Sequence, residues 1–274
     1  MNVRVMCAGA LVVACAGAAM AQEAMYTASG TMPSPGTFWL RTQPHYFQYG
    51  SSPVNGTDRT DRYELMNTVA YGLDRGVAIY VDVPFEHSSE RDGATGDRDS
   101  HDGVDELNAM VKWRVYRHDS GGVDTLRAVL MGGLMTEFED QAHVDPMVGG
   151  ALTRVMGRHG FNQDLFYRLT TGGTESTNLG GEGPADAVLF NSAYVFRVAP
   201  SQYTSETVGA WYVTAEVNGM YETNGDTELR WSPGLMYEGR KVGLEIMAQF
   251  PLWNDVDHRA ELDFGIGVGF RVVF

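Results

Sequence analysis

Apolar residues alternate with polar or small residues along most of this chain, and the pattern is clearest near its C-terminal end. Every second residue from Leu262 to Phe274 is apolar, while the residues between them are charged or Gly, apart from Val273. Successive side chains of a β-strand point to opposite faces, so this segment predicts a strand with one apolar and one polar face. In a soluble β-sandwich the apolar face would contact a core. In an outer-membrane β-barrel it contacts lipid while the polar face lines a lumen, and a last strand ending on Phe is typical of that class.

The same alternation recurs along the chain and predicts about twelve strands. In residues 76–88, for example, Tyr80 and Asp82 lie on one face, and the other face carries Val77, Ile79, Val81, Val83 and Phe85. The predicted strands span residues 37–49, 61–73, 76–88, 104–117, 124–137, 146–157, 160–171, 186–199, 209–222, 227–238, 241–253 and 259–273.

The connections between these strands alternate in length. Long polar stretches such as residues 89–103 and 171–185 follow odd-numbered strands, whereas tight turns such as 74–75 and 239–240 follow even-numbered ones; residues 200–208 are an exception. Long loops on one rim and short turns on the other are the topology of outer-membrane barrels. We therefore predict an all-β fold, a transmembrane antiparallel up-and-down β-barrel with long extracellular loops and short periplasmic turns. A soluble β-sandwich is the alternative.

The first 21 residues have the features of a secretory signal peptide. Arg4 places a positive charge ahead of the apolar residues 5–14, and Ala19-Met20-Ala21 fits a cleavage site. We expect cleavage after Ala21 and location in the bacterial outer membrane. A lipoprotein-type cleavage before Cys15 is the alternative. Cys7 and Cys15 both precede Ala21, so we expect no disulfide in the mature chain.

After the signal we expect two parts, a periplasmic N-terminal segment at residues 22–36 and the transmembrane β-barrel at residues 37–274. The sequence leaves open whether the N-terminal segment extends into the periplasm or enters the pore.

Charge narrows the range of partners. The chain has 20 Lys and Arg against 35 Asp and Glu, a formal net charge of −15, which argues against nucleic-acid binding. We expect contacts with outer-membrane lipid and lipopolysaccharide, with the barrel-assembly machinery through the strand ending in Phe274, and with a small solute. No cofactor is expected.

The polar face of each strand is where the sequence directs a search for function. If Phe274 faces lipid, this face carries charges of both signs, which either fill a narrow barrel as ion pairs or orient a solute in a conduit. Several Met side chains share the face, and the thioether adapts to solutes of varied shape, although Met as filler is the simpler interpretation. The predicted pore-lining residues are Arg62, Glu64, Asp82, Glu86, Lys112, Arg114, Arg127, Asp164, Arg168, Glu216, Glu228, Arg230, Glu245, Asp263 and Arg271.

Three short runs carry a resemblance to a known family. Pro35-Gly36-Thr37-Phe38 precedes the first predicted strand, and Trp231-Ser232-Pro233-Gly234-Leu235 is followed by Val242-Gly243-Leu244-Glu245. Together with the strand layout they resemble the outer-membrane family of meta-pathway phenol-degradation proteins, which are transporter-like. The resemblance implies an outer-membrane barrel associated with the uptake of small aromatic or hydrophobic compounds, and it brings no catalytic residues.

Candidates for catalysis and metal binding are weak. His87 and Ser88 are adjacent, so on a strand they point to opposite faces and cannot act together as base and nucleophile. Residues 97–103 are dense in oxygen ligands, but their spacing is wrong for a calcium loop. We therefore expect no enzyme and no dedicated metal site. The leading hypothesis is a passive channel for small solutes; the alternatives are a non-conducting structural or surface-interaction barrel and an outer-membrane lipid hydrolase.

Overall fold

The computed structural model describes residues 23–54, 56–104, 106–121, 123–138, 143–172, 175–176, 181–182 and 185–274. The predicted signal peptide and its cleavage site lie outside these residues. The strands are β1 (Phe38–Tyr49), β2 (Thr57–Gly72), β3 (Val77–Asp92), β4 (Arg98–Gly103), β5 (Glu106–Ser120), β6 (Asp124–Glu137), β7 (His143–Met156), β8 (His159–Arg168), β9 (Glu175–Ser176), β10 (Gly181–Glu182), β11 (Ala187–Ala199), β12 (Gly209–Glu222), β13 (Thr227–Gly239), β14 (Val242–Asp255) and β15 (Leu262–Val273).

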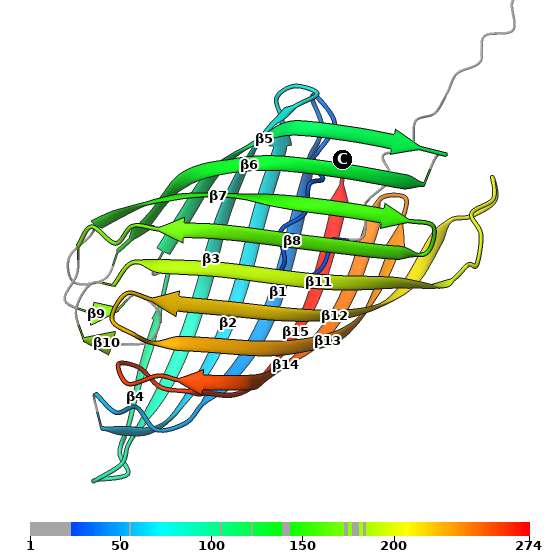
Figure 1. Cartoon of the computed structure of the whole chain (residues 1–274). Helices are drawn as coiled ribbons and strands as arrows, with labels where there is room; N and C mark the ends of the chain where they lie inside the picture. The colour runs from blue at the N-terminus through cyan, green and yellow to red at the C-terminus, as the bar shows by residue number, and fades with distance from the viewer. Residues whose placement is uncertain are drawn as a thin grey trace, which may run out of the picture.

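Twelve of these strands form one closed antiparallel barrel (Figure 1). Each strand pairs with its neighbours in the sequence, and β1 closes the ring by pairing with both β2 and β15. The remaining strands are short additions, since β4 pairs only with β3, and β9 pairs with β10. The predicted all-β barrel of about twelve strands is confirmed. The described residues contain no helix that is long and apolar enough to cross a membrane.

The two rims of the barrel differ as the sequence predicts. One rim, here called the turn end, carries the turn after β2 at residues 73–76, the turn after β13 at residues 240–241, and the C-terminus. The opposite rim, the long-loop end, carries β4 and the β9–β10 hairpin (Figure 1). Much of the predicted loop at residues 89–103 is in fact paired strand, because β3 runs on to Asp92 and β4 pairs back against it.

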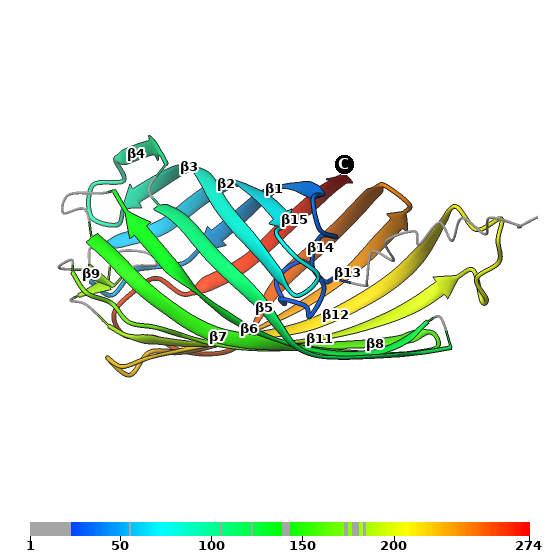
Figure 2. The ribbon, with the colours of Figure 1, turned by 90° about the horizontal axis from the view of Figure 1, so that it is seen from above.

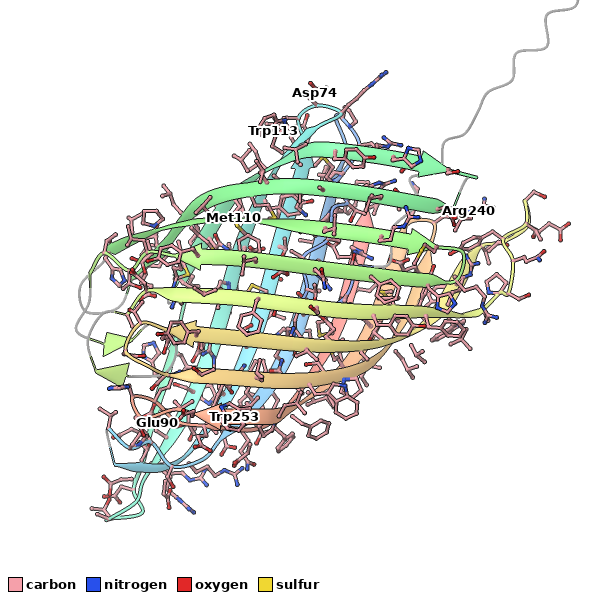
Figure 3. All side chains as sticks on the ribbon, in the orientation of Figure 1. Asp74, Glu90, Met110, Trp113, Arg240 and Trp253 are labelled. Carbon is pink, nitrogen blue, oxygen red and sulfur yellow. The ribbon has the colours of Figure 1, made fainter. Side chains whose placement is uncertain are left out.

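The outer face of the barrel is apolar. Large hydrophobic side chains such as Leu134, Val148 and Leu165 are more than half exposed on this wall. Trp113 lies near the turn end and Trp253 near the long-loop end (Figure 3), where amphipathic rings suit the interface between hydrocarbon and water. A wall of this kind is stable only where hydrocarbon, rather than water, covers it.

Replacement of Val148 by Arg tests this view of the outer wall. Val148 is 62% exposed in the middle of β7, so in hydrocarbon a charge there should cost about 2–4 kcal/mol of unfolding free energy. Urea titration of the protein refolded into phosphatidylcholine vesicles measures this cost, and Val148→Leu is the matched control. Stability that is unchanged or raised by the Arg would show that lipid does not cover this face.

Candidate solute pathway in the lumen

Residues 23–33 lie inside the barrel towards the turn end, next to the inner wall (Figure 2), and residues 34–36 are exposed at the rim. The sequence left open whether this segment extends away from the barrel or enters the pore, and the structure places it in the lumen. Ala24, Thr27 and Ser29 are almost fully buried there. The chain then leaves the lumen at Pro35, which forms a bridge with Gly72 at the end of β2.

Side chains of the wall hold the backbone of this N-terminal segment. Glu216 on β12 accepts a hydrogen bond of 2.9 Å from the Met25 amide and one of 2.6 Å from the Thr27 hydroxyl. Asp164 on β8 accepts one of 2.6 Å from the Ala28 amide. Lys112 on β5 donates to the carbonyl oxygens of Ser29 and Thr31 at 3.0 and 3.1 Å. Three distant strands therefore fix one short segment.

Ion pairs anchor the first described residue of the segment. Arg271 on β15 lies 2.9 Å from Glu23 and 2.8 Å from Glu238 on β13. Burial alone would raise the pKa of Glu23, but the positive charges of Lys112, Arg271 and Arg41 lower it below its usual value. Glu23 is therefore held as a carboxylate inside the barrel.

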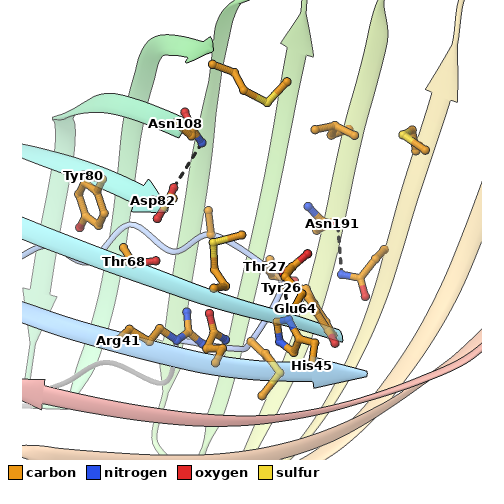
Figure 4. A pocket seen from close by; sticks show the side chains of 18 of the residues that line it. Tyr26, Thr27, Arg41, His45, Glu64, Thr68, Tyr80, Asp82, Asn108 and Asn191 are labelled. Atoms are coloured by element: carbon orange, nitrogen blue, oxygen red, sulfur yellow. Dashed lines mark hydrogen bonds and ion pairs between the residues drawn. The ribbon is translucent and has the colours of Figure 1, made fainter. Parts of the chain in front are cut away.

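Between this segment and the long-loop end lies a cavity of about 520 Å³ (Figure 4). Its lining combines polar and charged groups with apolar side chains, which include the rings of Trp39 and Phe47 as well as methionines. Tyr26, His45, Glu64 and Arg62 contribute polar and charged groups, with His45 Nδ1 lying 3.2 Å from Glu64 and Arg62 lying 3.0 Å from the same carboxylate. The methionines of the lining are Met25, Met66, Met110, Met131, Met135, Met147 and Met220.

A chain of hydrogen bonds that links three amide side chains and a hydroxyl to the Asp164 carboxylate crosses one wall of the lumen. Asn191 donates to Asp164 at 2.7 Å, Asn218 donates to Asn191 at 3.0 Å, Ser232 donates to Asn218 at 2.9 Å, and Gln249 donates to Ser232 at 3.1 Å. The five residues lie on β8, β11, β12, β13 and β14. Our sequence analysis considered only charged and Met side chains, so it missed these amides, although the alternation along each strand places them on the inner face.

The loop after β14 folds back into the long-loop end of the lumen. Arg259 in this loop is fully buried and lies 3.3 Å from Glu222, 2.9 Å from Glu228 and 3.8 Å from Asp226. His258 lies 2.9 Å from the same Asp226. The loop is thereby fixed to the β12–β13 hairpin and narrows the mouth. Arg259 was not among the predicted lining residues. The sequence analysis placed it at the start of the strand predicted for residues 259–273, whereas in the structure it lies in the loop ahead of β15.

The structure brings together most of the predicted lining residues. One group lines the cavity: Arg62, Glu64, Asp82, Lys112, Arg168, Glu228 and Arg230. A second group contacts the N-terminal segment or its partners: Arg127, Asp164, Glu216, Glu245 and Arg271. Glu86 pairs with Arg62 at 2.7 Å, and Arg114 donates to the Arg75 carbonyl at the turn end.

Asp263 does not fit the predicted pattern. The pairing of β1 with β15 shifts between Gln48 and Tyr49, so that Leu262, and not Asp263, is buried inside the barrel. Asp263 is exposed and accepts a hydrogen bond of 3.0 Å from Gln48. A one-residue shift moves every later side chain to the other face, which is why strict alternation placed Asp263 inward.

His87, which the sequence analysis considered as a catalytic base, forms a surface pair with a carboxylate. His87 lies 2.6 Å from Asp102 on the adjacent strand β4, and both side chains are exposed. Residues 98–103, part of the oxygen-rich stretch, form β4 itself.

Solved structures with a similar fold are outer-membrane barrels. An outer membrane channel from Pseudomonas putida F1 matches with a TM-score of 0.60 and 12% identity, over 89% of this chain and 97% of that one. The β-domain of the Bordetella autotransporter BrkA matches at 0.52 and 13% identity, over 88% and 100%. The NanC porin matches at 0.51 and 9% identity, over 85% and 98%. No family model and no curated protein matches the chain. This chain thus has the fold of outer-membrane β-barrels.

Proposed function

We propose that the protein is a passive outer-membrane channel for small solutes, with the long-loop end facing the exterior and the turn end facing the periplasm. The observation that carries this proposal is a cavity of about 520 Å³, lined by charged, polar and thioether groups, inside a closed barrel whose outer wall is apolar. Such a lumen offers water and solutes a polar path through hydrocarbon. It needs neither a cofactor nor an energy source.

The two kinds of lining favour amphipathic solutes. Thioether side chains adapt to an apolar or aromatic ring, while groups such as Arg62 and Glu64 can bind a polar substituent. This chemistry agrees with the resemblance to the meta-pathway phenol-degradation family, and we propose membership of that family on the same grounds.

Planar-bilayer recording of the refolded mature chain tests the channel directly. We expect discrete conductance steps, which should be small because the N-terminal segment and the Arg259 loop narrow the lumen. If neither the full chain nor a chain lacking residues 23–33 conducted ions or admitted solutes into liposomes, a non-conducting structural barrel would be the better account.

Charge reversal at Arg230 should change the ion selectivity of the channel. Arg230 lines the cavity and pairs with Glu228 at 2.7 Å, so Arg230→Glu replaces a cation in the pathway with an anion. We expect the reversal potential in a salt gradient to shift towards cation preference. Arg240→Glu, at an exposed position on the turn-end rim (Figure 3), is the matched control. Equal shifts in both variants would argue against a path past Arg230.

A further inference from the structure

Three potential metal ligands meet on the inner face of the β6–β7 hairpin. Glu137 is the last residue of β6 and pairs in register with His143, the first residue of β7, while Asp145 lies two residues further along β7. Side chains two residues apart on a strand share a face, so His143 and Asp145 point the same way. One oxygen from each carboxylate and one ring nitrogen all lie within 4.8 Å of one another.

The cluster of Glu137, His143 and Asp145 is at the long-loop end of the lumen, between the cavity and the long-loop rim. Met135 and Met147, the neighbouring inward residues on the two strands, both line the cavity. The His143 and Glu137 side chains are 11% and 19% exposed, so solvent reaches them, whereas the Asp145 side chain is fully buried. A cation arriving from the long-loop side could therefore reach the cluster without crossing the membrane.

The Asp145 carboxylate is held so that one oxygen points into the cluster. Its Oδ1 accepts a hydrogen bond of 2.8 Å from the Thr171 amide, in the loop after β8. Its Oδ2 is buried, has no hydrogen-bond donor among the described residues, and lies 3.6 Å from His143 Nε2. Burial of a carboxylate oxygen without a donor is costly, and coordination to a cation removes that cost. A ligand whose second oxygen is fixed by the backbone is typical of metal sites.

The neighbouring groups add to this arrangement. Glu137 Oε2 lies 3.3 Å from His143 Nε2, and its other oxygen is also buried without a donor among the described residues. The charged neighbours of Glu137 include Glu106 as well as Arg168, so the three carboxylates outnumber the one guanidinium when His143 is neutral. An added divalent cation would balance the excess negative charge.

We propose that Glu137, His143 and Asp145 bind a divalent transition-metal cation such as Zn²⁺ at the long-loop end of the lumen. One imidazole nitrogen with two carboxylate oxygens is a ligand set that suits Zn²⁺, and three protein ligands leave a position open to water or a solute. The site joins β6, β7 and the loop after β8, so bound metal would stiffen this side of the mouth. Our sequence analysis missed it, because it searched only for ligand spacing along the chain, and Glu137 comes from the opposite strand.

Titration of the mature protein in detergent micelles with Zn²⁺, in competition with a chromophoric chelator, tests the site. We expect one tightly bound Zn²⁺ per chain, and His143→Gln and Asp145→Asn should each weaken binding by about 10-fold or more, since even loss of an outer-shell partner costs 10–100-fold. Glu137→Gln is a third variant of nearly unchanged shape. His87→Gln, which alters an exposed His–Asp pair at the same rim, is the matched control and should leave affinity unchanged.

The outcomes are distinct. Retention of the folded barrel is checked for each variant by its heat-modifiable migration in gel electrophoresis. Absence of Zn²⁺ binding by the unsubstituted chain, or binding that all three ligand variants retain in folded form, would overturn the proposal. Because the readout is metal affinity in micelles, it stands or fails independently of whether the barrel conducts solutes.

Discussion

A mature chain that begins at Ser34 should show a several-fold higher single-channel conductance than the full mature chain. Residues 23–33 lie in the lumen towards the turn end, and their removal would join the cavity of about 520 Å³ to the opening at that end. The wall groups that hold the segment, such as Glu216 and Lys112, would then contact water, which replaces the lost hydrogen bonds at modest cost. The barrel should therefore still fold. Planar-bilayer recording of both chains measures the difference.

A cross-link between the segment and the wall provides the opposite test. A Cβ built on Gly30 would lie 2.8 Å from Arg127 Cβ and 2.9 Å from the Arg127 carbonyl oxygen. In the double variant Gly30→Cys, Arg127→Cys the segment and the wall must therefore move apart by about 1 Å to reach disulfide geometry. The sequence has two cysteines, Cys7 and Cys15, and both precede Ala21, so a chain produced from Gln22 onwards contains no other thiol that could compete. We expect conductance to fall in the oxidised variant and to return on reduction. Equal conductance in both redox states would mean that the segment does not obstruct the path.

The alternation of apolar and polar residues was enough to predict most of the fold, because a membrane-spanning strand requires this alternation. A strand between hydrocarbon and a polar lumen must place apolar and polar residues on opposite faces, so the inward direction of Asp82, Lys112 and Arg230 follows from counting in twos. The count fails only where pairing slips. The shift in pairing register at Gln48 and Tyr49 buries Leu262 and exposes Asp263. No residue in that stretch of the sequence predicts such a shift.

The interior of the barrel was less predictable, because it depends on contacts between residues far apart in the sequence. In the sequence, Thr27 and Ser29 resemble residues of any polar linker. Only the fold shows that Glu216 binds Thr27 and that Lys112 binds Ser29, each from a distant strand. Arg259 is a similar case. The sequence placed it at the start of a predicted strand, but it lies in the loop before β15, and its burial depends on carboxylates that the β12–β13 hairpin supplies.

Replacement of Arg259 by Met should lower the free energy of unfolding by about 3–5 kcal/mol, the range for breaking a buried ion pair by removing one partner. Arg259 is fully buried, and so is Glu222, whose only ion pair among the described residues is with Arg259. The substitution would leave the Glu222 carboxylate buried without a counter-charge. The cost at Glu228 would be smaller, because this carboxylate keeps its 2.7 Å ion pair with Arg230.

Urea titration of the refolded barrel measures the loss, and two further variants separate charge from packing. Arg259→Lys keeps the positive charge but loses the planar fork whose Nε and Nη1 lie near Glu222 and Glu228, so its stability should fall between those of the natural chain and Arg259→Met. Arg117→Met removes an exposed arginine paired with Asp119 and should change stability little. If Arg259→Met were as stable as Arg117→Met, the buried charge cluster would not hold the loop. If instead Arg259→Lys were as unstable as Arg259→Met, the two-pronged geometry of the guanidinium, more than its charge, would account for the stability of the mouth.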